Sequence, residues 1–120
     1  MKRALAAQRS VAPKVSTGEV TSKLAARDAI LIRLRQIKPD LTVRYHLRSL
    51  GLFGSYGRGS QTRRSDIDIL VSFTETPTLF AFVRLKRELE HSLGKRVDLV
   101  MREALRPSIG RRIVAEIAEA

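Results

Sequence analysis

The segment from Asp66 to Phe73 constrains the fold more than any other part of this 120-residue chain. Apolar side chains stand at every second position of it, namely Ile67, Ile69, Val71 and Phe73. Because alternate side chains of an extended strand share one face, this pattern predicts a strand packed on helices along that face. Asp66 and Asp68 then fall together on the opposite face, with their Cα atoms about 6–7 Å apart.

Helical spacing of apolar residues predicts one helix before this strand and one after it. The first covers residues 23–38, where Pro39 is expected to end a stripe made of Ile30, Leu31, Leu34 and Ile37. The second opens at Pro77 and Thr78, runs to residue 93 and is capped by Gly94. Its predicted buried side consists of Leu79, Phe82, Leu85, Leu89 and Leu93.

Two further strands and a last helix complete the predicted order. Residues 47–53 and 96–101 are typical of short strands, and a helix is expected from about Pro107 to Ile117. The order helix, strand, strand, helix, strand, helix predicts an α/β (α+β) fold, with a small mixed sheet packed against helices. We expect one domain over residues 23–120, preceded at 1–22 by a flexible basic arm that has no acid before Glu19.

Composition narrows the classes of protein to consider. No apolar run approaches the roughly 20 residues needed to span a bilayer, so no membrane association is expected. The chain has no cysteine, which excludes disulfides and thiolate metal sites and suits the cytoplasm. The formal net charge of +11 favours a polyanionic partner such as a nucleotide or nucleic acid. Aromatic residues are only 5%, without a stacking platform, so a plain solvated basic surface stays an equal alternative to a nucleic-acid patch.

Two carboxylates on one strand face suggest a metal site. The charges of Asp66 and Asp68 repel each other, and a divalent cation with a preference for oxygen ligands, such as Mg²⁺, removes the conflict. Asp98, on the polar face of the strand over 96–101, is the candidate third ligand. Three such carboxylates can hold two metal ions, as in enzymes that catalyse displacement at phosphorus. The alternative is a set of solvated acids at a strand edge.

A glycine-rich turn at residues 54–59 supplies the complementary half of such a site. Gly54 lets backbone N–H groups approach phosphate oxygens, and Ser55 adds a hydroxyl donor. Arg58 is a candidate phosphate contact, although a structural salt bridge explains it equally well. Arg63 and Arg64 are more typical of solvated loop charge.

These motifs, in this order, resemble those of a known family. Phe53-Gly54-Ser55, ten further residues and Asp66-Ile67-Asp68-Ile69 are similar to the signature of the DNA polymerase beta-like nucleotidyltransferase superfamily. The longer runs GLFGSYGRGS, SDIDILV and KRVDLV resemble its minimal nucleotidyltransferase branch, which includes the MntA-type antitoxins paired with HEPN-domain toxins. The resemblance covers about residues 47–117.

The resemblance implies a fold, a reaction and a role for each motif residue. The fold would be that of the nucleotidyltransferases, with Gly54 and Ser55 at the β- and γ-phosphates of ATP. Asp66, Asp68 and Asp98 would bind two Mg²⁺ ions and act as the catalytic residues, with Asp98 also helping to deprotonate the attacking hydroxyl.

In the antitoxin branch AMP passes to a tyrosine of the HEPN-type toxin, so the implied function is a protein adenylyltransferase that acts as an antitoxin. Two alternatives stay open. One is an antitoxin that neutralises its partner by binding alone, and the other is nucleotidyl transfer to RNA or to a small molecule.

Overall fold

The computed structural model describes residues 15–120, and its four-stranded sheet runs in the order β3-β2-β1-β4. Strand β1 (Leu47–Phe53) pairs antiparallel with β2 (Ile67–Phe73) and with the short β4 (Ala118–Glu119). Strands β2 and β3 (Val97–Met101) are parallel, and helix α4 (Leu79–Leu93) connects them. The predicted mixed sheet packed against helices is confirmed.

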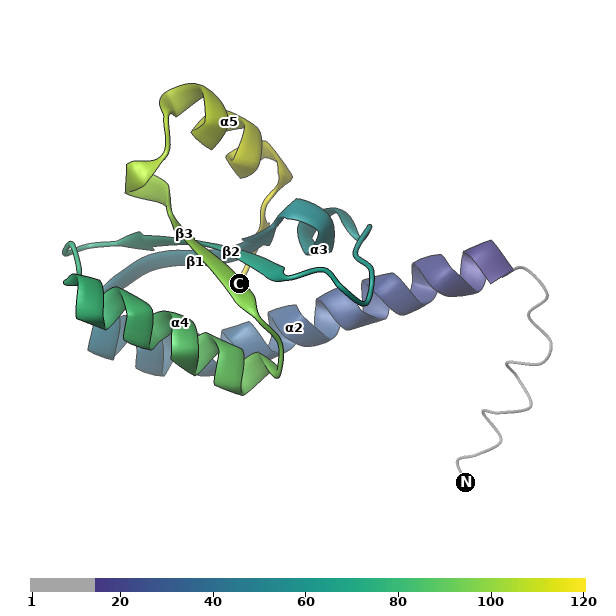
Figure 1. Ribbon diagram of the computed structural model, residues 1–120, viewed down its shortest axis with the longest axis horizontal. Coiled ribbons are helices and arrows are strands. Elements are labelled where there is room, and N and C mark those ends of the chain that lie inside the picture. Colours follow the sequence, from purple (N-terminus) through teal and green to yellow (C-terminus); the bar gives the residue numbers. More distant parts are fainter. Residues whose placement is uncertain (1–14) are drawn as a thin grey trace.

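The helices cover both faces of this sheet (Figure 1). The long helix α2 (Val15–Tyr45) and α4 lie on one face, and α3 (Gly54–Arg58) and α5 (Pro107–Glu116) lie on the other. A 3-10 turn, η1 (Arg102–Ala104), leads from β3 into α5. No helix within residues 15–120 has the length and apolar character needed to cross a bilayer.

The predicted alternation along β2 accounts for the centre of the core. Ile67, Ile69 and Val71 are fully buried and pack in one cluster with Leu34 of α2 and Leu85 of α4. The opposite face of β2 is covered too, since Leu70 and Ser72 are buried. The Ser72 hydroxyl donates a hydrogen bond to Glu103 Oε2 at 2.9 Å, which satisfies the polar group inside the protein.

The prediction that Pro39 ends the first helix is wrong. The helix continues through Pro39 to Tyr45, where Leu41 and Tyr45 are 2% and 5% exposed. A proline inside a helix costs about 3 kcal/mol. Burial of two large side chains offsets that cost, because each contributes about 1.5–3 kcal/mol.

The first helix also begins earlier than predicted. Helix α2 starts at Val15 rather than at residue 23, so residues 15–22 are helical. Residues 1–14 lie outside the described part of the chain, and the division into a basic arm and a domain stays a prediction.

Helix α4 follows the prediction at its ends and departs from it at one position. Its first turn is capped by the Thr78 hydroxyl, which accepts a hydrogen bond from Ala81 N at 3.1 Å, and Gly94 caps the other end at φ 70°. Leu79, however, is 75% exposed rather than buried. The rest of the predicted stripe faces the core, with Leu85 and Leu89 fully buried and Phe82 and Leu93 partly buried against it.

Candidate active site

Asp68 and Asp98 are brought together by the parallel pairing of β2 and β3. They are direct partners in the register, each at the second position of its strand. Residues in register on neighbouring strands project their side chains from the same face of the sheet. On the other side of Asp68, the register partner is Phe53, the last residue of β1. The chain therefore enters the glycine turn directly beside the two carboxylates.

Gly54 lies against the carboxyl group of Asp68. Its φ is 67°, which side chains with a Cβ rarely adopt, and a Cβ built there would lie 2.1 Å from Asp68 Oδ2. Helix α3 begins at Gly54 itself, within the predicted glycine-rich turn. The glycine is therefore required both by the backbone conformation and by the space that Asp68 occupies.

The negative charge of Asp68 is poorly balanced by positive charge around it. Its pKa is raised above 3.8, first by burial, then by the negative charges of Asp98 and Asp66 and by a hydrogen bond to Asp98. The positive charge of Arg58 lowers the pKa only in small part. A divalent cation would relieve this repulsion, and carboxylate oxygens are the ligands that Mg²⁺ prefers. The donor set of Asp68 and Asp98 therefore fits such an ion.

Asp66 is in contact with a basic side chain. It lies just before β2, and its Oδ1 is 3.4 Å from Nε of Arg96, a residue just before β3. Within residues 15–120, no three acidic or histidine side chains lie close enough together to hold one metal ion. Of the three predicted ligands, the structure thus pairs Asp68 with Asp98 and leaves Asp66 beside Arg96.

Ser55 and Arg58 both belong to α3, the short helix that begins at Gly54 beside Asp68. Arg58 Nη1 forms a 3.2 Å ion pair with Glu116 Oε1 of α5, so a structural role for it is observed. The Ser55 carbonyl oxygen accepts a hydrogen bond from Ser60 N at 2.8 Å, which closes the turn after α3. Both residues remain candidates for the phosphate contacts predicted from the sequence.

Sequence reasoning missed Arg96 and Glu116. Arg96 could have been found, because Asp66 and Arg96 directly precede Ile67 and Val97, the first pair of the register that joins Asp68 to Asp98. Glu116 carries no such signal, since its contact with Arg58 depends on how α5 returns over the sheet.

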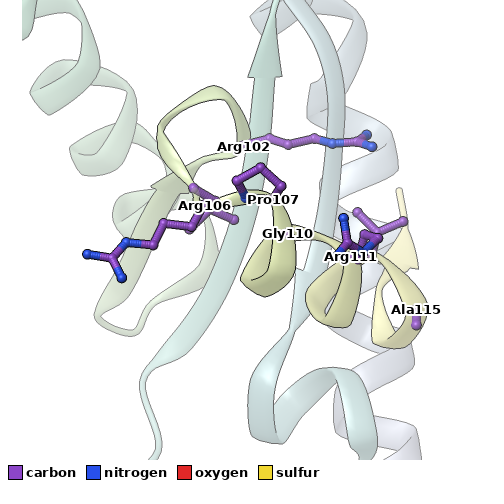
Figure 2. Close-up of a pocket in the computed structure, with 8 residues that line it drawn as sticks. Arg102, Arg106, Pro107, Gly110, Arg111 and Ala115 are labelled. Atoms are coloured by element: carbon purple, nitrogen blue, oxygen red, sulfur yellow. The ribbon is translucent and has the colours of Figure 1, made fainter.

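A hollow of about 520 Å³ lies between η1 and α5 (Figure 2), and none of these acids lines it. Three arginines, Arg102, Arg106 and Arg111, line it together with apolar side chains, and its lining contains no carboxylate. It contains none of the site residues predicted from the sequence. The acid pair, rather than this hollow, is therefore the candidate centre of the chemistry.

The comparison with protein families decides the class of protein. The family described as "Nucleotidyltransferase domain" matches residues 31–118. The chain belongs to this nucleotidyltransferase family. Its match contains the glycine turn, Asp66, Asp68 and Asp98, so the family resemblance and the class of enzyme predicted from the sequence are both confirmed.

One relative of known name and two solved structures are similar to this chain. The protein adenylyltransferase MntA of Thermococcus cleftensis is 45% identical over 80 residues, which are 67% of this chain and 81% of that protein. A solved toxin–antitoxin structure with AMP-PNP has 31% identity and a TM-score of 0.58, covering 78% of this chain and 70% of that one. A complex of tri-AMPylated Shewanella oneidensis HEPN toxin with MNT antitoxin has 26% identity and a TM-score of 0.52, covering 81% and 70%.

Proposed function

We propose that this nucleotidyltransferase moves AMP from ATP to a tyrosine hydroxyl of a HEPN-type toxin, and so acts as its antitoxin. The pairing of Asp68 with Asp98 beside Gly54 is the observation that carries the proposal. The two carboxylates suit a divalent cation, and the glycine next to them leaves space for phosphate groups to approach the backbone. The similarity to MntA, and to the complex that contains an AMPylated HEPN toxin, supports the acceptor. The proposed compartment is the cytoplasm, which suits a chain without cysteine.

The proposed reaction is a single displacement at the α-phosphorus of ATP. The acceptor oxygen forms a bond to phosphorus while the bond to the bridging oxygen breaks, and pyrophosphate leaves. The hydroxyl proton passes to the carboxylate of Asp98. Gly54 and Ser55 bind the β- and γ-phosphates, and Arg58, whose positive charge acts on Asp68, is the proposed further phosphate contact.

Asp68 and Asp98 are the proposed principal ligands of Mg²⁺, with Asp66 as the third ligand and two ions as the full complement. When bound, the metal supplies positive charge that stabilises the phosphate oxygens during the displacement. The two acids of the pair lie in different positions in the sheet. The carboxylate of Asp68 lies on the inner strand β2 beside Gly54, and that of Asp98 is exposed on the edge strand β3, which leaves it accessible to a protein acceptor.

The test is incubation with Mg²⁺ and α-labelled ATP, with and without the HEPN protein encoded beside this chain, followed by intact mass. A gain of AMP mass on the partner, abolished in Asp68→Asn, supports the proposal. Neutralisation of the partner by Asp68→Asn without any label would instead indicate an antitoxin that acts by binding. Label on added RNA or on a small molecule would indicate a different acceptor.

A further inference from the structure

Asp66 and Arg96 face each other just outside the parallel strands. The backbone N–H of Ile67 donates to the Arg96 carbonyl at 2.9 Å, so strand pairing extends to this position. The side chains add a contact of their own, 3.4 Å from Arg96 Nε to Asp66 Oδ1. Backbone and side-chain contacts together therefore place Arg96 beside Asp66, the predicted metal ligand outside the pair of Asp68 and Asp98.

Arg96 is part of a basic pocket of about 390 Å³ at this edge of the sheet. Its lining comes from two loops and consists of Arg63, Arg64, Ser65, Asp66, Lys95 and Arg96. Lys95 Nζ donates to the Arg63 carbonyl at 3.2 Å, which ties the two loops together. Four cationic side chains thus line a pocket that holds a single carboxylate, and their positive charge favours the ionised form of Asp66 there.

We propose that Arg96 is a positioning residue that holds Asp66 in the basic pocket and competes with the divalent cation for its carboxylate. The inference rests on the proposed function, in which Asp66 is the third metal ligand. It also gives the contact between Asp66 and Arg96 a function beside the acid pair. Phosphate groups of the incoming nucleotide are the natural replacement anion for Arg96, so nucleotide and metal each favour binding of the other.

The competition is modest because both groups are in contact with water. The side chains of Arg96 and Asp66 are 82% and 45% exposed, and exposed ion pairs are weak. Removal of the Arg96 charge is therefore expected to tighten metal binding by about three- to fivefold. An easily opened contact of this kind positions Asp66 without locking it.

The experiment measures binding of Mn²⁺ alone to the nucleotide-free full chain, from the free-ion signal in electron paramagnetic resonance. The variant is Arg96→Gln, and the matched control is Arg64→Gln, which removes an equal charge from the same pocket but not the ion pair with Asp66. Both changes are repeated in the Asp66→Asn background. Thermal unfolding verifies that each variant is folded.

The expected result is tighter Mn²⁺ binding in Arg96→Gln than in Arg64→Gln, with the difference abolished in the Asp66→Asn background. Equal affinities in the two variants would overturn the inference while leaving the proposed function intact. Failure of the wild-type chain to bind Mn²⁺ in a manner sensitive to Asp68→Asn would overturn the inference together with the metal site of the proposed function.

Discussion

Gly54 lies so close to Asp68 that a Cβ on the glycine would be 2.1 Å from Asp68 Oδ2. The end of β1 and the inner strand β2 therefore meet at the carboxylate itself, and α3 begins at the glycine that makes this contact. A side chain at residue 54 has to displace either the backbone or the acid. The first prediction follows from this contact.

Gly54→Ala is expected to lower the free energy of unfolding by about 1–3 kcal/mol, because it combines a backbone at φ 67° with a steric clash. The rate of nucleotidyl transfer by the folded variant should fall at least about a hundredfold, because a displacement of about 1 Å at the acid pair suffices for a loss of that size. Urea unfolding and labelled-ATP transfer measure the two effects.

Gly94→Ala is the matched control. Gly94 has a similar φ of 70°, but a Cβ there would meet nothing within 4 Å. We expect it to destabilise by about 1 kcal/mol and to leave transfer unchanged. Equal losses of transfer in both variants would contradict the assigned role of the contact between Gly54 and Asp68.

Asp68→Asn is expected to separate stability from activity. The pKa of Asp68 is raised by burial and by the charges of Asp98 and Asp66, so its ionised form destabilises the metal-free fold. That cost is present at neutral pH and is relieved as the pH falls through the raised pKa toward 3.8. The variant should therefore be at least as stable as wild type at pH 7 in EDTA, with an advantage that shrinks on acidification.

Transfer by the same variant should drop at least about a hundredfold, since the amide cannot replace an anionic ligand. Thermal melts across pH and the transfer assay provide both measurements. Loss of stability at pH 7 would show that Asp68 supports the fold rather than straining it. Asp40→Asn is a suitable control, because the pKa of that exposed acid is lowered by its hydrogen bond to Arg44.

Acid sensitivity should reside at the junction of α2 and α4. Arg44 forms two hydrogen bonds with the Glu88 carboxylate, at 2.8 and 2.5 Å, and Tyr45 donates a third. The hydrogen bond from Arg44 is the main reason why the pKa of Glu88 is lowered from 4.5 to about 2. A depressed pKa stabilises the fold above pH 4.5, and this contribution is lost as the pH falls toward about 2.

Glu88→Gln should therefore reduce stability at pH 7 by about 1 kcal/mol, a value reduced for solvent screening of a partly exposed pair. The difference from wild type should disappear near pH 2. Urea unfolding at a series of pH values measures it. A constant difference across that range would mean that packing, and not the charge, accounts for the loss.

Much of the fold could be predicted because local patterns and tertiary packing agree. The alternation of Ile67, Ile69 and Val71 defines one face of β2, and Thr78 and Gly94 mark the ends of α4 through capping chemistry. Pro39 was misjudged because burial of Leu41 and Tyr45, which only the tertiary structure reveals, outweighs a strong local signal.

The candidate site also contains contacts that could be predicted from the sequence and contacts that could not. Asp68 and Asp98 could be assigned as partners because each stands on the polar face of an alternating strand, and the register confirms their pairing. The contact of Asp66 with Arg96 was missed, since Arg96 lies just before β3 and its place beside Asp66 follows only from the register of β2 with β3. Likewise the contact between Arg58 and Glu116 depends on the path of α5, which local periodicity does not specify.

Arg58 offers the final prediction, because two functions were open for it. Its ion pair with Glu116 is 3.2 Å long and joins α3 to α5, but both side chains are substantially exposed, so the pair contributes at most about 1 kcal/mol. The same guanidinium lowers the pKa of Asp68 slightly, which places its positive charge near the acid pair. We expect Arg58→Gln to raise KM for ATP about three- to tenfold through the loss of a charged phosphate contact. Glu116→Gln, which removes the ion pair but keeps the arginine, should leave KM within about twofold. Steady-state transfer kinetics of the two variants decide between the functions, since equal changes in KM would mean that Arg58 only holds α5 in place.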